Sequence, residues 1–481
     1  MYPLPRLFLS AAHKSSGKTT VSIGLCAEFA HRGLRVQPFK KGPDYIDPMW
    51  LGRAARRPCY NLDYNTMSSE EILAFFGDRG ADADLCLIEG NKGLHDGLAL
   101  DGRDSNAAVA RLLQAPVVLV IDTQGITRGI APLLLGYQHF DPEVRIGGVI
   151  LNRVAGERHG EKLRAAVEHY TDIPVLGWVR RATDLVLDER HLGLIPSNEQ
   201  ADADRHIQAI RSRIAEQVDV DALLRLAGTA PPLERPRLPP APARPLPRLR
   251  VGIARDRAFG FYYPDDLETF TRLGAELVPI DLVHDARLPE RLDALFIGGG
   301  FPETAMEALA ANAGMRHSVR TAIEGGLPTY AECGGLMYLA RSIRWHERSA
   351  EMVGVIPGDV VMGRRPVGRG YIRLRETPAH PWPGDGALPA AGDQVIAAHE
   401  FHYSRIEHLD IPGPFAYQVV RGHGLDGTHD GIVLHRLLAS YAHLRDTGKY
   451  RWIHRFLAFA ARFANNVAES SKGTGNQAGT P

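Results

Sequence analysis

Short runs of aliphatic and β-branched residues alternate with longer helical segments from Arg6 to about Val179. This alternation is typical of βαβ units, in which parallel strands form a sheet that helices cover on both faces. The runs VVLVID and GGVILN are apolar at successive positions, as expected of central strands that are buried on both faces. We therefore predict an α/β fold with a P-loop-type parallel sheet. The predicted strands are RLFLSA, RVQPFK, ADLCLIEG, APVVLVID and RIGGVILN, with a helix from Lys18 to Arg32.

A proline-rich segment, residues 229–248, interrupts this pattern with eight prolines in 20 residues. Such a composition favours an extended, semi-rigid linker. The strand pattern then restarts with LRVGIAR, ELVPID, DALFIGGG and LPTYAECGG, which predicts a second α/β domain. We expect one domain at residues 1–228, another at 249–467, and a disordered tail of small polar residues at 468–481.

Charge and cysteine content argue against several classes of protein. Lys and Arg together number 56, as do Asp and Glu, so no overall field favours a nucleic acid or an anionic membrane. The four cysteines lack CxxC spacing, which argues against a disulfide framework, a zinc site or an iron–sulfur cluster. No window reaches about 18 uninterrupted apolar residues. We expect a cytoplasmic protein with no nucleic-acid or membrane partner.

The segment SAAHKSSGKTT, residues 10–20, follows a predicted strand and opens a predicted helix, which is the context of a phosphate-binding loop. In such a loop Gly17 lets the backbone approach the phosphates, Lys18 neutralises their charge, and the Thr19 hydroxyl ligates Mg²⁺. The full GxxxxGK[ST] pattern has glycine where Ala12 stands, so an ordinary loop before a capped helix is the alternative. The residues expected to bind the nucleotide phosphates are Ser16, Gly17, Lys18, Thr19 and Thr20.

Three carboxylates follow predicted strands of the same sheet. Asp44 and Asp47 lie in the loop KKGPDYIDP, and Glu89 ends a strand and leads into EGNKGLHDG. Loops at the carboxyl ends of strands in an open α/β sheet face the ligand crevice. Carboxylates beside bound phosphate suggest Mg²⁺ ligation or positioning of a nucleophile. The alternatives are Asp-Pro turn chemistry for the pair and a solvated strand-end acid for Glu89.

A cysteine in the second half lies at a predicted strand-to-helix turn, in LPTYAECGGLMYLA. Such a turn would hold Cys333 exposed, and the helix N-terminus would lower its thiol pKa and offer N–H groups to an oxyanion. The glycine run 298–300 follows another strand and could supply the opposing donor. A small buried apolar residue is the alternative for a lone cysteine. The residues leave the base open among His399, His402, His435 and His443.

These motifs together resemble the cobyrinic acid a,c-diamide synthase family. The N-terminal domain of that family is similar to dethiobiotin synthetase, and its C-terminal domain is a class I glutamine amidotransferase domain of the cobyrinate and cobyrate synthase type. The resemblance covers about Leu7 to Glu199 and continues beyond the linker. The motifs, in the family's order and spacing, are SSGKTT, KKGPDYIDP, IEGNKGLHDG, VVLVID, GGVILNRV and ERHLGLIPSNE.

For the first domain, the resemblance implies binding of ATP and Mg²⁺ and phosphorylation of a substrate carboxylate. It places Lys18 and Thr19 on the nucleotide phosphates and the metal, Glu89 on Mg²⁺, and Asn152 near the base. The residues that it places near the reacting acid are Asp44, Asp47 and Asp96.

For the second domain, the resemblance selects His443 as the base of Cys333, because residues 440–443 match the family's Ser/Thr-Tyr-x-His motif. No carboxylate stands two residues after His443, and the branch that the chain resembles lacks this third member of the triad. The segment HEFHYS, with His399, His402 and Tyr403, would lie near the domain contact or the substrate; structural histidines are the alternative.

The resemblance implies an ATP- and glutamine-dependent ligase that amidates the a- and c-acetates of cobyrinate or hydrogenobyrinate through an acyl phosphate. A sirohaem-type tetrapyrrole is the alternative substrate. Lys92 and Arg445 differ from the residues typical of the corrin enzymes, and these two differences point weakly towards the sirohaem-type substrate. An alternative of another class is a non-catalytic P-loop ATPase fused to a ligand-binding module. The expected partners are glutamine and the tetrapyrrole acid, and a homodimer is compatible with the sequence.

Overall fold

The computed structural model describes residues 1–181, 189–190, 193–200, 202–238, 246–382, 384, 395–411 and 413–473. The chain divides into two compact units, Met1–Pro239 and Pro240–Pro481. Their boundary falls within the proline-rich segment 229–248, of which residues 239–245 lie outside the described residues. The start of that segment belongs to the first unit, because the backbone of Leu233 pairs with that of Tyr2.

The first unit is built on one parallel sheet of seven strands. These are β1 (Arg6–Ala11), β2 (Val36–Lys41), β3 (Tyr60–Leu62), β4 (Leu85–Glu89), β5 (Val117–Asp122), β6 (Ile146–Val154) and β7 (Val175–Arg180). Their order is β3-β2-β4-β1-β5-β6-β7. Because β1 lies at the centre, the loop that follows it emerges in the middle of the sheet's carboxyl edge, where ligands bind in open α/β sheets.

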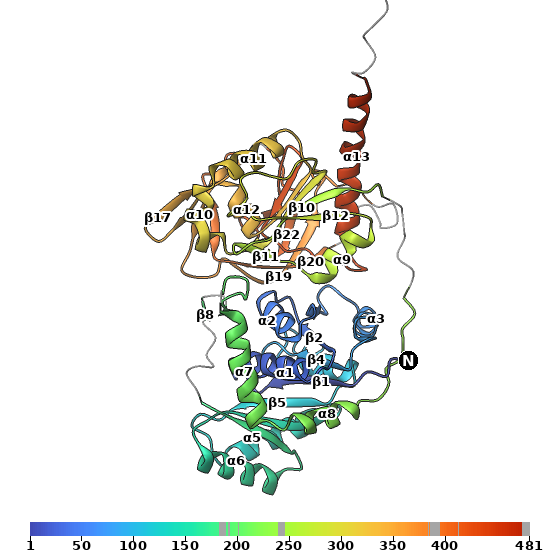
Figure 1. Cartoon of the computed structure of the whole chain (residues 1–481), viewed down its shortest axis with the longest axis vertical. Helices are drawn as coiled ribbons and strands as arrows, with labels where there is room; N and C mark the ends of the chain where they lie inside the picture. The colour runs from blue at the N-terminus through green and yellow to red at the C-terminus, as the bar shows by residue number, and fades with distance from the viewer. Residues whose placement is uncertain are drawn as a thin grey trace, which may run out of the picture. The chain divides into compact units, whose positions relative to one another are not determined.

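Helices cover both faces of this sheet (Figure 1). They are α1 (Lys18–His31), α2 (Ile46–Ala55), α3 (Ser69–Gly80), α4 (Asn106–Leu112), α5 (Ile130–Phe140), α6 (Glu157–Tyr170), α7 (Ala203–Gln217) and α8 (Val220–Gly228). Helices α1, α2, α7 and α8 form one core with Leu7 and Leu9 of β1, whereas α3 to α6 form the other with Phe8. Successive residues of a strand point to opposite faces, so the continuous apolar runs of the sequence supply both cores. The short strands β8 (Glu189–Arg190) and β9 (Gly193–Leu194) pair in antiparallel fashion.

The second unit has a six-stranded sheet in the order β12-β10-β13-β15-β25-β24. Its members are β10 (Arg250–Ala254), β12 (Glu276–Ile280), β13 (Ala294–Ile297), β15 (Thr329–Glu332), β24 (Ile432–Leu434) and β25 (Leu437–Ser440). All pairings are parallel except that of β24 with β25. The carboxyl ends of β15 and β25 are therefore neighbours, which brings residues about 110 positions apart in sequence together.

Two groups of helices bury the faces of this second sheet. Helices α10 (Met306–Ala311), α11 (Ala313–Glu324) and α12 (Gly334–Leu339) lie on one face, and α9 (Pro264–Arg272) and α13 (Trp452–Gly473) lie on the other. A short 3₁₀ helix, η1 (Pro302–Ala305), precedes α10.

Three smaller sheets complete the second unit. One contains β16 (Ala340–Trp345), β17 (Arg348–Glu351), β18 (Ile356–Met362) and β21 (Ser404–Glu407). Another contains β19 (Gly368–Glu376), β20 (Val395–His402), β22 (Tyr417–Arg421) and β23 (His429–Asp430). A third pairs β11 (Phe259–Phe261) with β14 (Gly299–Gly300).

These observations confirm the predicted α/β fold with a parallel sheet in each half. Helix α13 continues to Gly473, and residues 474–481 lie outside the described residues. Disorder of the tail at 468–481 stays a prediction. Among the described residues, none of the helices combines the length and the apolar composition needed to cross a bilayer.

The buried side chain of Arg6 fixes the start of the central strand. It donates hydrogen bonds to the carbonyl oxygens of Leu113 (2.6 Å), Leu4 (2.8 Å) and Pro231 (2.6 Å). Burial lowers the pKa of Arg6 to about 10, which still leaves the guanidinium charged at neutral pH.

We predict that Arg6→Met destabilises the first unit by about 3 kcal/mol, because buried carbonyl groups lose a charged donor. Hydrogen exchange of the β1 amides should report the loss as faster exchange. Arg35→Met is the control, since Arg35 lies on the surface in an exposed pair with Asp84. Unchanged β1 protection in Arg6→Met would contradict the role of this side chain.

Candidate functional site

The loop between β1 and α1 has the geometry of a phosphate-binding loop. Gly17 adopts φ +86°, and a Cβ there would lie 2.1 Å from Nδ2 of Asn152, so only glycine fits. Asn152, at the end of β6, donates that Nδ2 to the carbonyl oxygen of Ser16 at 2.8 Å. The structure thus places Asn152 against the loop backbone, and contact with the base stays a prediction. Lys18 begins α1 and is buried, with Thr19 and Thr20 in the same first turn.

Alanine at position 12 does not disrupt this loop. The residues of the loop with positive φ are Ser15 and Gly17, so Ala12 needs no glycine-specific conformation. Its carbonyl oxygen accepts a hydrogen bond from the Tyr137 hydroxyl at 2.6 Å. The departure from the full glycine pattern is therefore accommodated by the backbone itself.

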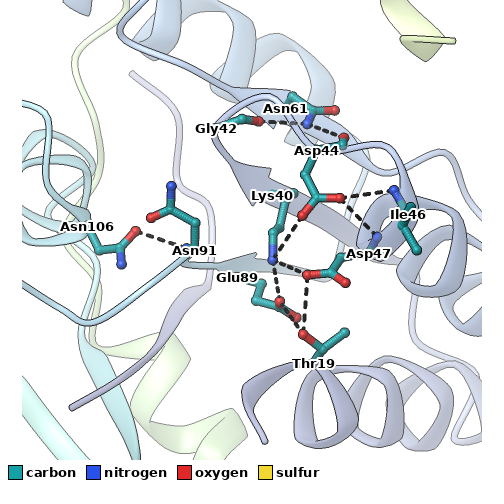
Figure 2. Close-up of polar contacts among 10 residues, drawn as sticks. All are labelled: Thr19, Lys40, Gly42, Asp44, Ile46, Asp47, Asn61, Glu89, Asn91 and Asn106. Atoms are coloured by element: carbon teal, nitrogen blue, oxygen red, sulfur yellow. Dashed lines mark hydrogen bonds and ion pairs between the residues drawn. The ribbon is translucent and has the colours of Figure 1, made fainter. Parts of the chain in front are cut away.

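Three of the predicted carboxylates meet around one lysine (Figure 2). Nζ of Lys40 lies 2.5 Å from Asp47 Oδ2, 2.6 Å from Glu89 Oε1 and 3.8 Å from Asp44 Oδ2. Lys40 and Glu89 face each other because they are register partners on β2 and β4. Thr19 Oγ1 donates to Glu89 Oε1 at 2.9 Å, which joins the phosphate loop to the same cluster.

The charges in this cluster are strongly coupled. The pKa of Lys40 is raised well above its usual value, because the surrounding carboxylates outweigh the effect of burial. Burial and the neighbouring Asp47 raise the pKa of Asp44, whereas the Lys40 charge outweighs burial at Asp47 and lowers its pKa. Burial, and then the charge of Lys40, lowers the pKa of Lys18 to about 8. The neighbouring carboxylates thus compensate the charge of Lys40, and Lys18 is the ammonium group at the phosphate loop itself.

The oxygen ligands of the cluster fit Mg²⁺. Glu89 is fully buried, and among the described residues its Oε2 has no hydrogen-bond partner. Carboxylate and hydroxyl oxygens are hard ligands, and Mg²⁺ typically uses one or two carboxylates together with substrate phosphates. Thr19 and Glu89 are therefore suited to hold the ion that accompanies a nucleotide.

The loop after β4 packs on the phosphate loop. A Cβ at Gly93 would lie 2.6 Å from the carbonyl oxygen of Ala12. Asp96 Oδ2 accepts a hydrogen bond from the backbone N–H of Gly93 at 2.9 Å, which stabilises the loop after β4. Asp96 itself is exposed. Lys92 is exposed on the same loop. The predicted residues Asp44, Asp47, Glu89 and Asp96 are thus grouped around the phosphate loop.

In the second unit, Cys333 occupies a strained turn between β15 and α12. Its φ of 45° and ψ of −99° are rare for a residue with a side chain, and such strain is typical of functional sites. A Cβ at Gly334 would lie 2.9 Å from the backbone nitrogen of Gly300, which places the predicted glycine run beside the turn. Burial, followed by the Glu303 and Glu332 carboxylates, raises the pKa of the Cys333 thiol. The predictions that the turn holds Cys333 exposed and that the helix terminus lowers its thiol pKa are therefore wrong, because Cys333 is buried.

The structure separates the four candidate histidines. His435 is exposed at the turn between β24 and β25, whereas His443 is buried at the carboxyl end of β25, next to the Cys333 turn. The Cys333 N–H donates to the Ser440 carbonyl oxygen at 2.8 Å. His443 Nδ1 lies 3.3 Å from Glu332 Oε2. This geometry favours His443 as the base.

The HEFHYS segment packs against His443 and the neighbouring Tyr441. The rings of His399 and His443 stack with centroids 4.8 Å apart, and the two residues exchange backbone hydrogen bonds. His402 stacks on Tyr441 with centroids 3.9 Å apart, and Tyr403 is half-buried beside it. Burial, and then the neighbouring charges, lowers the pKa of His399 well below its usual value. His399 and His402 are therefore buried structural neighbours of His443 and Tyr441 within the second unit.

The departure at Arg445 has a structural explanation. Arg445 is buried, and its Nη2 lies 3.1 Å from Asp265 Oδ2 on α9. Its guanidinium also lies over the Tyr263 ring, 4.9 Å from the centroid. Because Arg445 contacts residues of its own unit, its presence is no longer an argument for a sirohaem-type substrate.

Sequence reasoning missed Lys40 and Glu332. Lysines are almost never fully buried, so the pair in KKGPDYIDP carried no signal that one of them would enter a carboxylate cluster. Glu332 directly precedes Cys333, whereas the carboxylate was sought after His443. Only the pairing of β15 with β25 brings Glu332 to that histidine.

We predict that Lys40→Met destabilises the nucleotide-free first unit by about 3–5 kcal/mol, because buried carboxylates lose their counter-charge. Hydrogen exchange of the β2 and β4 amides should become faster. Lys92→Met, at an exposed position, serves as the control. Wild-type protection in Lys40→Met would show that this ammonium does not neutralise the cluster.

Comparisons with known proteins agree with this geometry. A family model described as a CobQ/CobB/MinD/ParA nucleotide binding domain matches residues 10–195, and one described as a CobB/CobQ-like glutamine amidotransferase domain matches residues 250–448. A cobyrinate a,c-diamide synthase of Magnetococcus marinus is 46% identical over 96% of this chain and 97% of its own length. One of Methanosarcina acetivorans is 39% identical over 95% of each chain. The chain therefore belongs to the cobyrinate a,c-diamide synthase family, and it is a glutamine-dependent amide ligase.

Proposed function

We propose that this enzyme amidates the a- and c-acetate carboxylates of cobyrinate or hydrogenobyrinate, with ATP as the activating substrate and glutamine as the nitrogen donor. The observation that carries the proposal is that one chain holds both a phosphate loop with a buried lysine and a strained cysteine whose turn is bonded to the segment of a buried histidine. The similarity to cobyrinate a,c-diamide synthases over nearly the whole chain supports the substrate.

Ammonia is released in the second unit. His443 takes the thiol proton as the Cys333 sulfur attacks the amide carbon of glutamine, and the Gly298–Gly300 run and the start of α12 supply backbone N–H groups to the oxyanion. The C–N bond then breaks, the proton moves to the leaving nitrogen, and a glutamyl thioester and ammonia form. Water hydrolyses the thioester to glutamate and restores the thiol.

The acid is activated in the first unit. Lys18 and the loop N–H groups hold the phosphates of ATP while a substrate carboxylate oxygen attacks the γ-phosphorus, which gives an acyl phosphate and ADP. Thr19 and Glu89 would hold Mg²⁺, which supplies neutralising charge to the phosphates. Asp44, Asp47 and Asp96 line the loops beside the reacting acid, with Lys40 between the first two and Glu89. Ammonia attacks the acyl carbon, and phosphate leaves.

Neutral ammonia links the two half-reactions, because the second unit releases it and the first unit consumes it. Protonation in bulk water would remove ammonia as a nucleophile. A single polypeptide that holds both sites keeps the two reactions together. We also place the enzyme in the cytoplasm, a proposal supported by the four free cysteines.

The substrate assignment is tested by incubating the protein with ATP, Mg²⁺ and amide-¹⁵N-glutamine, with cobyrinic acid and sirohaem in parallel. We expect mass spectrometry to find two ¹⁵N atoms in the corrinoid product. Amidation of sirohaem alone would move the enzyme to the sirohaem-type substrate. If neither acid is amidated, even with free ammonia, the tetrapyrrole assignment is wrong.

We predict that Cys333→Ala abolishes glutamine-dependent amidation but retains amidation driven by ammonium salts, because only the nitrogen source depends on the thiol. Lys18→Ala is the matched counterpart in the first unit, and it should lose amidation from both nitrogen sources while keeping some glutaminase activity. Product formation from each nitrogen source is the measurement. Equal loss of both activities in Cys333→Ala would contradict the assigned role of the cysteine.

A further inference from the structure

We propose, resting on the roles of Cys333 and His443 above, that Glu332 is the positioning carboxylate of the glutaminase site. It holds the imidazole of His443 in the tautomer and orientation that the thiol requires. The carboxylate thus comes from the residue immediately before the nucleophile, rather than from a residue downstream of the histidine.

The first support is the contact between the two side chains. Glu332 Oε2 lies 3.3 Å from His443 Nδ1, and both residues are at most 3% exposed. A carboxylate oxygen can only accept, so Nδ1 carries the proton. Nε2 then keeps the lone pair that a base needs.

The second support is that Glu332 is itself fixed. Its Oε1 accepts the Tyr330 hydroxyl at 2.7 Å and the backbone N–H of Leu444 at 2.9 Å. Because Leu444 follows His443 in the chain, one carboxylate holds both the ring of the histidine and the backbone beside it. Such support lets a catalytic ring keep one orientation.

The ring of His443 is also confined at its faces and edge. His399 stacks on it with an interplanar angle of 14°. A Cβ at Gly299 would lie 2.5 Å from His443 Cε1, so the glycine run leaves room only for the ring. Because these neighbours restrict the orientation of the ring, the contact of Glu332 with Nδ1 leaves Nε2 as the basic nitrogen of His443.

The chemistry needs such a carboxylate. Burial raises the pKa of the Cys333 thiol, so formation of the thiolate depends on transfer of its proton to the imidazole of His443. The imidazolium that forms is stabilised by the adjacent Glu332 charge. Other ionisable groups that act on this thiol include Glu303 of η1 and Asp430 of β23. His443 and Arg445 act on the ring of His399.

The test compares Glu332→Gln, Glu332→Asp and a matched control, Glu376→Gln, in the full chain. Glu376 is also a buried carboxylate that accepts a tyrosine hydroxyl, from Tyr450 at 2.7 Å, but its charged partner is Arg455. We expect Glu332→Gln to lower the glutaminase kcat by at least about 100-fold with little change in KM, as for other positioning carboxylates. Glu332→Asp should recover part of that loss, and Glu376→Gln should keep the wild-type kcat.

The pH dependence of Cys333 alkylation by iodoacetamide separates two roles for the carboxylate. If Glu332 acted only as a nearby negative charge that raises the pKa of the thiol, its removal would move the alkylation curve to lower pH. A positioning role predicts the opposite shift, to higher pH, because the thiolate–imidazolium pair loses its support. A shift to lower pH, or a kcat within a few-fold of wild type, would overturn the proposal.

Ammonia-dependent amidation controls for folding, because Glu332→Gln should retain it at the wild-type rate. Loss of this activity together with glutaminase would indicate a structural role and would overturn the proposal. Failure of the proposed function is recognised separately, since Cys333→Ala would then keep its glutamine-dependent activity.

Discussion

Compensation of buried charge at the carboxyl edge of the first sheet determines how that site is built. Lys40 brings an ammonium among carboxylates from the α2 loop and β4, where an unpaired charge would be costly. Thr19 extends the same network to the phosphate loop. The positions of the loop, of α1 and of the acidic residues are therefore coupled, and a nucleotide enters a site whose charges are already balanced.

The second unit uses the same topological position for different chemistry. Again a loop follows a central parallel strand and opens a helix, but it carries a strained cysteine instead of a lysine. The neighbouring strand β25 delivers His443, and β15 itself delivers Glu332. Parallel strands that end side by side thus gather the proposed catalytic groups in both units.

The sequence predicted much of this arrangement, because its signals are local. The apolar runs identified the strands, and the glycine, lysine and threonine of residues 17–19 identified the phosphate loop. The motif around Cys333 identified the strand-to-helix turn. What it could not predict depends on strand pairing and burial: the place of Lys40 among the carboxylates, the contact of Glu332 with His443, and the internal pairing of Arg445 with Asp265.

The central claim is that ATP activates the substrate carboxylate as an acyl phosphate before ammonia attacks. It is tested most directly with cobyrinic acid labelled with ¹⁸O in its acetate carboxylates, by measuring the isotope in the inorganic phosphate released. One ¹⁸O atom should appear in phosphate for each amide formed, because the carboxylate oxygen leaves with the phosphoryl group. Amide formation with unlabelled phosphate would contradict the account.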